Sequence, residues 1–279
     1  MQAIFDNHNL IKDWLIGRAL SGQPGATVMD LGVGKLGDLF KYKSHNIARL
    51  IGIDNNPEHL AEARRRLCEH PVAFQRCVSL LLQDLTAPPA SYAKTLDALV
   101  KDDSLDLAVA NFSLHYLFRT KDIIVDSLKM VVRKLKKPGG QMIGTTVNGD
   151  AVLQLLSGGG GGADRQHFKN DLFELSIAPQ QQDGFGRQLN MSIAESIIDD
   201  DHKSKEFLVT QALLKTVASE AGLELTQVLP FDTIASRYGS AMRRPLHVLH
   251  ADQACLSHLN MAFVLSFPPP AGPSSSSSS

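Results

Sequence analysis

The chain has 279 residues, of which 43% are hydrophobic, and a formal net charge of −1. This length suits one large domain with a sizeable core, and the near-neutral charge excludes a protein that coats nucleic acid by bulk charge. The apolar runs are far shorter than the roughly 20 residues of a membrane helix, and the first residues lack the pattern of a secretory signal. The three cysteines, an odd number at wide spacing, predict reduced thiols and an intracellular protein.

Short apolar runs alternate with helical patterns over the first half of the chain. The predicted strands are 26–31, 49–54, 78–82, 105–110 and 141–146. Among the helical patterns, "PEHLAEARRRLCEH" has a proline in its first turn and basic residues further along. "TKDIIVDSLKMVVRKLKKPGG" has apolar residues at helical spacing and a Pro-Gly-Gly stop. This alternation predicts a parallel sheet with helices on both faces, which binds ligands at the carboxyl ends of its strands.

The second half contains a break, more strands and a tail. "SGGGGGAD", residues 157–164, predicts a flexible loop within the domain. We expect the later segments to complete the sheet and cover its mouth: polar strand-like pieces at 168–177 and 187–195, a helix over 206–221, and strands at 225–231 and 261–267. The Pro- and Ser-rich tail, 268–279, is predicted to be disordered. The sequence therefore predicts one domain over residues 1–267.

A glycine turn follows the first predicted strand. Gly32, Gly34 and Gly37 have the G-x-G-x-x-G spacing of a dinucleotide-binding turn, but Asp30 precedes them and Asp38 follows them. Each carboxylate would repel a pyrophosphate there by about 1–4 kcal/mol. S-adenosylmethionine reverses the sign, because its methionine end carries an ammonium and a sulfonium. The turn therefore predicts S-adenosylmethionine as the cofactor.

Further polar residues follow at successive strand ends. Asp54 is expected to accept both ribose hydroxyls, and Asp84 to accept from the adenine amino group. Lys12 or Lys35 can meet the single carboxylate of the cofactor. Each acid taken alone is also typical of a helix cap or a solvated turn. Their occurrence together favours a cofactor site.

The segment "VANFSLHYLF", residues 109–118, borders the same edge of the sheet because it follows the fourth strand. Phe112, His115 and Tyr116 offer stacking area and polar edges, which proteins use to bind an unpaired base. The alternative is that the two aromatic rings pack under the next helix and His115 caps it.

Several motifs resemble, in order, those of the mRNA cap guanine-N7 methyltransferases of eukaryotes and large DNA viruses. "HNLIKDWLI" resembles the family's Asn-Asn-aromatic-Ile-Lys-Ser-x-Leu-Ile opening, and "VMDLGVGKLGDLFKY" its glycine turn. "GIDNNPEHLAEARRR" is similar to its ribose strand and helix, "NFSLHYLF" to Gln-Phe-x-x-His-Tyr-x-Phe, "PGGQMIGTTVN" to its Pro-Gly-Gly strand, and "KEFLVTQ" to the segment opening a late helix. The resemblance spans roughly residues 5–267. It implies a Rossmann-like class I methyltransferase fold, with a mostly parallel seven-stranded sheet and helices on both faces.

The resemblance also implies the ligands and the residues that bind them. S-adenosyl-L-methionine, with S-adenosyl-L-homocysteine as product, is surrounded by Lys12, Asp30, Gly32, Gly34, Lys35, Asp38, Asp54, Asp84 and Asn111. The cap guanine is held by Phe112, His115, Tyr116 and Glu206, while Arg66 touches the cap phosphates and Asn9 lies nearby. The implied partners are 5′-capped RNA and other capping enzymes, a guanylyltransferase or triphosphatase, fused or bound. A cellular protein would then act in the nucleus and a viral one in the cytoplasm.

The chain departs from the family pattern at several positions. Val33 and Leu36 replace a cysteine and a glycine in the turn, and we expect Leu36 to have a negative φ. Asn111 replaces glutamine, and His8 and Leu10 replace an asparagine and an aromatic residue. The family's cap-contacting tyrosine in the last strand has no counterpart in "LNMAFVLSF".

Methylation at N7 requires no general base, because this atom has a lone pair and no proton. The protein therefore needs only to align the reactants, and we predict no catalytic residue beyond positioning groups such as Glu206, which would accept from the guanine N1–H and 2-amino group. His247, His250, Asp252 and Cys255 have residue types found at zinc sites, but their spacing is loose. We predict no metal.

Two other functions stay open. A methyltransferase for another base, a protein or a small molecule would keep the acids and give residues 112–116 no role. A non-catalytic subunit with the same fold would bind RNA or a partner methyltransferase. Loss of the cofactor-binding residues would favour the hypothesis of a non-catalytic subunit. The presence of Asp30, Asp54 and Asp84 counts against this hypothesis.

Overall fold

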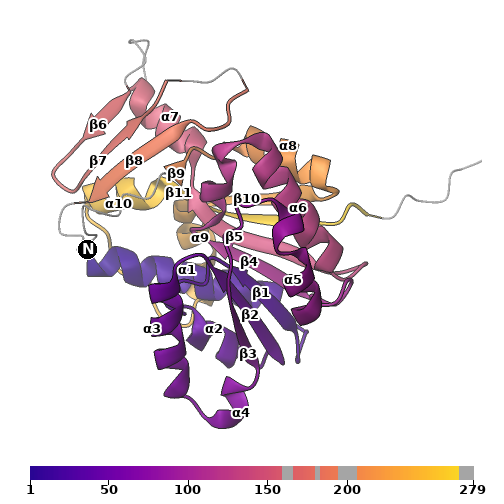
Figure 1. Ribbon diagram of the computed structural model, residues 1–279. Helices are drawn as coiled ribbons and strands as arrows, with labels where there is room; N and C mark the ends of the chain where they lie inside the picture. Colours follow the sequence, from indigo (N-terminus) through magenta and orange to yellow (C-terminus); the bar gives the residue numbers. More distant parts are fainter. Residues whose placement is uncertain (159–165, 180–182, 194–205, 270–279) are drawn as a thin grey trace, which may run out of the picture.

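The computed structural model describes residues 1–158, 166–179, 183–193 and 206–269. Its main sheet has seven strands in the order β10-β11-β5-β4-β1-β2-β3 (Figure 1). The strands are β1 (Thr27–Leu31), β2 (Arg49–Asp54), β3 (Val78–Leu82), β4 (Leu107–Asn111), β5 (Gln141–Val147), β10 (Glu224–Pro230) and β11 (Asn260–Ser266). All seven predicted strands are confirmed, with ends that differ by at most two residues.

The strand directions bring the carboxyl ends of several strands to one edge of the sheet. β1 pairs in parallel with β2 and β4, β2 with β3, and β4 with β5. Only β11 runs against its neighbours, because it is antiparallel to both β5 and β10. The carboxyl ends of β1, β2, β4 and β5 therefore meet at the same edge, and the prediction of a mostly parallel seven-stranded sheet is confirmed.

Helices cover both faces of this sheet (Figure 1). α5 (Ala93–Leu99), α6 (Lys121–Lys134) and α8 (Gln211–Ala221) bury their apolar side chains against alternate residues of the strands, including Met29 and Ile51. α1 (Gln2–Ala19), α2 (Leu39–Ser44), α3 (Pro57–Cys68) and α9 (Phe231–Tyr238) pack against the intervening residues, including Val28 and Leu50. The remaining helices are α4 (Val72–Gln75), α7 (Gly149–Ser157), α10 (Ala251–His258), and the short 3-10 turns Pro89–Ser91, Leu114–Arg119 and Gly239–Ala241. Within the described ranges, these helices are too short or too polar to cross a bilayer.

A second sheet, of four antiparallel strands, corrects one expectation. It consists of β6 (His167–Lys169), β7 (Phe173–Ile177), β8 (Gln188–Ile193) and β9 (Glu206–Phe207). The prediction that the strand-like pieces at 168–177 and 187–195 complete the main sheet is wrong. Alternate residues of β7 are buried against α7 and α10, while those between them are partly exposed. One apolar face suits an antiparallel sheet, whereas a central parallel strand needs two.

The segment around Glu206 also differs from the prediction. A helix was expected over 206–221, but Glu206 lies in β9, and α8 begins only at Gln211. The side chain of Thr210 caps α8 by accepting from the N–H of Leu213 at 3.3 Å. Thr210 thus supplies a helix start signal inside the predicted range.

Leu36 has the opposite backbone conformation to that expected. Its φ is +61°, in the left-handed region, rather than negative. A non-glycine residue costs about 1–2 kcal/mol there. The Leu36 side chain is only 3% exposed and belongs to the core beneath α1 and α2, and full burial of a leucine stabilises the fold by about 1.5–3 kcal/mol. The free energy gained by burying the Leu36 side chain therefore offsets the cost of its left-handed backbone conformation.

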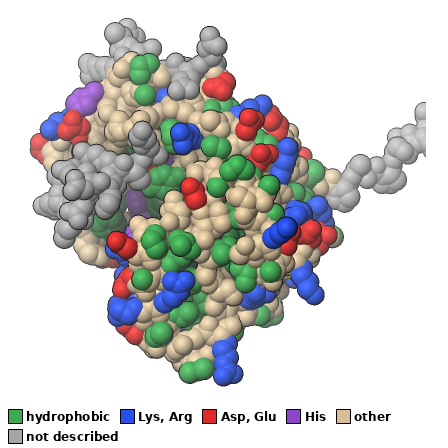
Figure 2. Space-filling view, in the orientation of Figure 1, with side chains coloured by type: hydrophobic (Ala, Val, Ile, Leu, Met, Phe, Trp, Pro, Cys, Tyr) green, Lys and Arg blue, Asp and Glu red, His purple; other side chains and the backbone are tan. Residues whose placement is uncertain are grey.

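Two predicted segments lie mostly outside the described residues. These are the glycine-rich loop, of which only Ser157 and Gly158 are described, and the tail beyond residue 269. Gly158 ends α7 with a φ of +66°. On the face shown in Figure 2, acidic and basic side chains are interspersed, which agrees with the near-zero net charge of −1.

Candidate active site

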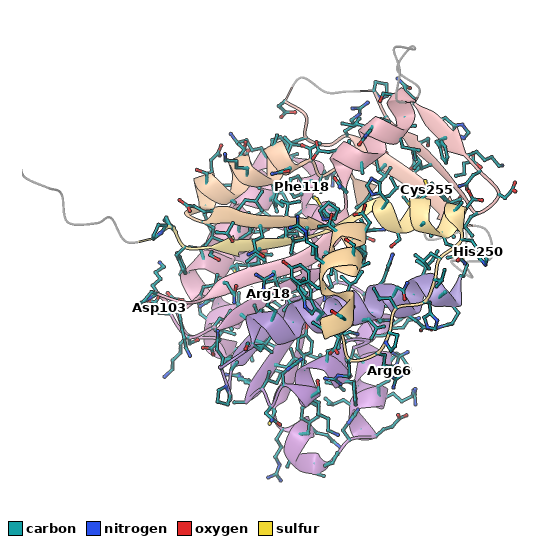
Figure 3. All side chains as sticks on the ribbon, turned by 180° about the vertical axis from the view of Figure 1, so that it is seen from behind. Arg18, Arg66, Asp103, Phe118, His250 and Cys255 are labelled. Carbon is teal, nitrogen blue, oxygen red and sulfur yellow. The ribbon has the colours of Figure 1, made fainter. Side chains whose placement is uncertain are left out.

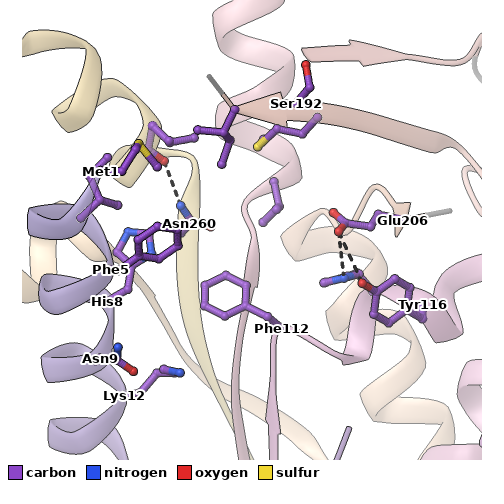
Figure 4. A pocket seen from close by; sticks show the side chains of 16 residues that line it. Met1, Phe5, His8, Asn9, Lys12, Phe112, Tyr116, Ser192, Glu206 and Asn260 are labelled. Atoms are coloured by element: carbon purple, nitrogen blue, oxygen red, sulfur yellow. Dashed lines mark hydrogen bonds and ion pairs between the residues drawn. The ribbon is translucent and has the colours of Figure 1, made fainter. Parts of the chain in front are cut away.

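A cavity of about 430 Å³ opens at the carboxyl edge of the main sheet (Figure 4). One wall is a face of α1, another is the segment after β4, and a third comes from β8 and β9 of the small sheet. The structure brings six of the predicted site residues to this cavity: Asn9, Lys12, Phe112, His115, Tyr116 and Glu206. Five of these were predicted for the guanine or its cap, and Lys12 for the cofactor.

One wall of the cavity is a polar cluster around Glu206. The Tyr116 hydroxyl donates to Glu206 Oε1 at 3.5 Å, and His115 Nε2 lies 3.8 Å from the same oxygen. Burial raises the pKa of Glu206, although the Tyr116 hydrogen bond opposes this shift. Because the carboxylate comes from a short strand of the second sheet, it reaches residues 90 positions away in the chain.

His115 is almost completely enclosed, with 3% of its surface exposed. Its Nδ1 lies 3.3 Å from the Thr146 hydroxyl, whereas its Nε2 has no hydrogen-bond partner among the described residues. Burial lowers the pKa of His115 to about 4, so the ring is neutral at pH 7. The enclosed neutral ring therefore forms part of the cavity wall beside the Glu206 carboxylate, 3.8 Å from its Oε1.

Phe112 supplies an aromatic face at the floor of the cavity. Its φ is +53° and its N–H donates to Thr145 O at 2.8 Å, so the chain turns sharply where β4 ends. His8, on α1, stacks on the ring at a centroid distance of 6.1 Å and an interplanar angle of 20°. Burial, together with the charge of Lys12, lowers the pKa of His8 to about 4. The wall between α1 and β4 is therefore aromatic and uncharged at this point.

Ten of the sixteen residues that line the cavity were not predicted from the sequence. α1 also contributes Met1, Ile4, Phe5 and His8, which share one helix face with Asn9 and Lys12 at helical spacing. This spacing is visible in the sequence and predicts that these side chains lie on one face of the helix. The side chains from β8, the residues Met191, Ser192 and Ile193, and those near β11, Leu256 and Asn260, have no local signal. Their positions depend on how the second sheet and α10 lie against the first sheet.

The predicted glycine turn forms at the end of β1. Gly32 has a φ of +78°, and a Cβ there would lie 2.4 Å from the Cβ of Ser113. Gly34 has a φ of +54°, and a Cβ there would meet no atom within 4 Å. The first glycine is therefore required by close packing, and the second leaves open space above the turn. Lys35, the next residue, is exposed.

Asp30 and Asp38 flank this turn; the first is buried and the second is 11% exposed. Asp30 is 4% exposed and accepts from the Tyr42 hydroxyl at 2.8 Å. Burial, and then the negative charge of Asp38, raises the pKa of Asp30 to about 7. Burial would also raise the pKa of Asp38, but two lysines outweigh it and lower that pKa below its ordinary value.

The groups around Asp38 form a network that the sequence did not reveal. Asp38 Oδ1 accepts from Lys12 at 3.0 Å and from Lys41 at 2.6 Å, and its Oδ2 accepts from the Asn111 amide at 3.0 Å. Lys12 and Asp38, predicted to bind opposite charges of a ligand, are bound to each other here. Asn111 ends β4, so this network ties α1, α2 and β4 together.

Asp54 and Asp84 have different surroundings. Asp54 ends β2, and its two oxygens accept from the N–H of Gly34 at 2.8 Å and of Asn56 at 2.9 Å. Asp84 is exposed beyond the end of β3, and its Oδ1 accepts from the backbone and hydroxyl of Thr86 at 2.8 and 2.7 Å. Asp54 therefore lies at the glycine turn, whereas Asp84 caps its own turn.

Two remaining groups lie outside the cavity lining. Arg66 lies on α3 (Figure 3). Its Nε donates to Glu62 at 2.8 Å. In the loosely spaced cluster before and within α10, His247 pairs with Asp6 at 3.5 Å and Asp252 accepts from Asn170 at 3.0 Å. The described part of the chain contains no group of three or more His, Cys, Asp or Glu side chains placed to hold a metal ion.

Solved structures share this fold at low sequence identity. The CcbJ methyltransferase from Streptomyces caelestis superposes with a TM-score of 0.57 at 16% identity, covering 95% of this chain and 90% of its own. The glycopeptide N-methyltransferase MtfA, solved with sinefungin, gives a TM-score of 0.52 at 13% identity, covering 93% of this chain and 94% of its own. At such identities the likeness shows the fold alone, which is that of class I methyltransferases.

Curated relatives are more similar in sequence. The mRNA cap guanine-N(7) methyltransferase of Cryptococcus neoformans is 28% identical over 235 residues, covering 81% of this chain and 36% of that protein. The Saccharomyces cerevisiae protein of the same name is 26% identical over 238 residues, covering 81% and 51%. The mRNA-capping enzyme of an African swine fever virus isolate is 33% identical over 135 residues, covering 46% and 15%. The chain thus spans about a third to a half of the cellular relatives' length.

The sequence model of one family, the mRNA (guanine-N(7))-methyltransferase domain, matches residues 4–247. This range includes the glycine turn, the acids beside it, the segment after β4 and Glu206. The chain therefore belongs to the mRNA (guanine-N(7))-methyltransferase domain family.

Proposed function

We propose that this chain transfers a methyl group from S-adenosylmethionine to N7 of the guanosine cap at the 5′ end of mRNA. The observation that carries the proposal is the cavity itself. It combines an aromatic face, Phe112, with a half-buried carboxylate, Glu206, and it opens at the sheet edge that holds the glycine turn. The family to which the chain belongs has this activity in its name.

The residues at the glycine turn fit S-adenosylmethionine. Around the turn, the three carboxylates of Asp30, Asp38 and Asp54 outnumber the two lysines that pair with Asp38, so the site favours a cation over a pyrophosphate. Each Asp54 oxygen accepts one backbone N–H and has a second lone pair for a ribose hydroxyl. Gly34 leaves space for a ligand above the turn. Asp84 is proposed for the adenine amino group, and Gly32, Lys35 and Asn111 for the same cofactor site.

The cavity fits guanine by shape and by hydrogen bonding. Phe112 can stack on the base, and the carboxylate of Glu206 can accept from N1–H and the 2-amino group. His115 is proposed to border the same base as part of the wall beside Glu206, because its Nε2 lies 3.8 Å from Glu206 Oε1. Asn9 is proposed to lie near the cap, and Arg66 to reach its phosphates. Glu206 is half-buried, with 30% of its side chain exposed, so a bound base would cover what remains open and strengthen these hydrogen bonds.

Catalysis then consists of alignment. S-adenosylmethionine, when bound, supplies a methyl group on a positively charged sulfur. Guanine N7 would form the new N–C bond with its lone pair while the methyl–sulfur bond breaks and leaves its electron pair on sulfur. N7 loses no proton, so the residues of the cavity are not required to act as an acid or base. Their task is to hold the base with N7 toward the glycine turn at near-contact distance.

A product analysis tests this function directly. The chain is incubated with labelled S-adenosylmethionine and RNA ending in a cap or in a triphosphate, and the RNA is then digested to nucleosides. We expect labelled 7-methylguanosine from capped RNA only. Label in another nucleoside, or in a non-RNA acceptor, would instead support a methyltransferase for a different substrate. Binding of RNA without any transfer would support the non-catalytic subunit.

Affinity for S-adenosylmethionine should depend on pH through Asp30. Its pKa of about 7 means that the unbound site holds a proton below neutrality. A bound cation favours the carboxylate, so binding releases this proton and weakens as the pH falls below 7. We expect an affinity loss on the order of 10-fold between pH 7 and pH 5.5 by calorimetry. Asp30→Asn should bind weakly with a flat profile, and a profile unchanged by this substitution would contradict the assignment.

Further partners follow from the proposed activity. Capped RNA is the substrate, and a guanylyltransferase or triphosphatase, bound or fused, is proposed to supply the cap. The viral relative is named as a capping enzyme, and the match covers 15% of it. We propose nuclear action for a cellular protein and cytoplasmic action for a viral one. The described residues are proposed to act as one domain over 1–267.

A further inference from the structure

Asn260 is a buried polar residue in the wall of the cavity opposite Glu206. It is the first residue of β11, is 6% exposed, and pairs in register with Val147, which also lines the cavity. The aromatic residue of β11, Phe263, is fully buried and does not line the cavity. The contribution of β11 to the cavity is instead a side-chain amide.

The orientation of this amide is fixed by its neighbours. Nδ2 donates to the carbonyl oxygen of Leu256 at 2.8 Å and to that of Ser257 at 3.4 Å. Backbone carbonyl oxygens only accept, so the NH₂ group must lie on their side and Oδ1 on the other. Oδ1 has no hydrogen-bond partner in the described ranges, and it is not among their fully enclosed unpaired atoms. Asn260 therefore presents an open acceptor at the cavity wall.

The position of this acceptor relative to Glu206 identifies what it can bind. In Figure 4, Phe112 lies between Asn260 on one side and Glu206 on the other. A guanine whose N1–H and 2-amino group meet Glu206 has its imidazole ring, and the sugar on N9, at the far end of the base. The sugar of a ribonucleoside carries hydroxyl groups, which are hydrogen-bond donors. A base carbonyl or a phosphate oxygen offers none.

We propose that Asn260 Oδ1 accepts a hydrogen bond from a ribose hydroxyl of the guanosine, which makes Asn260 a residue that selects a ribonucleoside over its deoxy form. The proposal rests on the proposed function, because it assumes that guanine binds to Glu206. It adds a sugar contact to the base contacts already described.

The test compares three cap dinucleotides, whose guanosine carries ribose, 2′-deoxyribose or 3′-deoxyribose. Relative kcat/KM values are measured for the wild type, Asn260→Ala and Asn260→Asp. We expect the wild type to prefer the ribose cap over at least one deoxy cap by about 3- to 10-fold, the effect of one neutral hydrogen bond. Asn260→Ala should lose this preference. Asn260→Asp keeps an acceptor but turns a carboxylate oxygen toward the carbonyls of Leu256 and Ser257, so it should lose activity on all three caps and retain the preference.

The ratio of kcat/KM between the ribose cap and the deoxy caps distinguishes a sugar contact of Asn260 from a structural role. If Asn260 only holds the end of α10, the alanine variant will lose activity equally on all three caps, and the proposal is overturned. Asn190→Ala, in an exposed part of β8, is the matched control and should keep the wild-type ratio. If the wild type methylates no cap, the proposed function fails, and dissociation constants for the same three caps decide the sugar contact. Equal constants, or no binding, would reject it.

Discussion

Asp54→Ala is expected to weaken S-adenosylmethionine binding by tens to several hundred-fold. The carboxylate would accept both ribose hydroxyls, and two charge-assisted hydrogen bonds contribute roughly 2–4 kcal/mol. The substitution also leaves the N–H groups of Gly34 and Asn56 without their partner, which we expect to lower the melting temperature. Calorimetry gives the dissociation constant, and a thermal melt gives the stability.

Two variants separate the effect on the ligand from the effect on the turn. Asp54→Asn keeps an oxygen for one of the two backbone N–H groups but removes the charge, so it should melt closer to the wild type while still binding weakly. Asp126→Ala removes an exposed acid of α6 and should leave both quantities unchanged. Wild-type affinity in Asp54→Ala would show that the ribose lies elsewhere. Stabilisation of the wild type by NAD, and not by S-adenosylmethionine, would reject the cofactor itself.

Glu206→Gln is expected to lower kcat/KM for a capped RNA by about 5- to 150-fold. The amide presents its NH₂ group where guanine presents N1–H and its amino group, and an unpaired buried donor costs about 1–3 kcal/mol. Affinity for S-adenosylmethionine should not change, because the glycine turn and its acids are separate from Glu206. Transfer assays on a cap dinucleotide measure the loss of guanine recognition, and calorimetry with S-adenosylmethionine measures the affinity for the cofactor.

A control variant and an altered cap test whether Glu206 recognises guanine. Glu174→Gln alters an exposed glutamate of β7 in the same small sheet and should leave transfer unchanged. A cap with adenosine in place of guanosine should be a poor substrate for the wild type, since its 6-amino group and bare 2-position invert the hydrogen-bond pattern. Equal turnover of both caps, or full activity of Glu206→Gln, would mean that the cavity does not recognise guanine. A different methyl acceptor would then be the better hypothesis.

The sequence by itself determined the main sheet and the edge at which we propose that the ligands bind. Each of its seven strands is a short apolar run, and the helices between them have apolar residues at helical spacing, so both signals are local. Parallel strands connected by helices must bring their carboxyl ends to one edge. For this reason Asp30, Asp54 and Phe112, although far apart in the chain, could be assigned to one site before the structure was known.

Only the tertiary structure decided how the site is enclosed. An alternating strand pattern shows that one face is buried, but it does not show which sheet the strand joins, so the second sheet and the place of Glu206 in it were missed. The pairing of Lys12 with Asp38 and Lys41, and the open oxygen of Asn260, depend on which side chains meet across elements. The left-handed φ of Leu36 has the same origin, because burial beneath α1 and α2 outweighs the local backbone preference. Contacts between distant segments leave no periodicity in the sequence, and they determine the ligand-facing chemistry of this cavity.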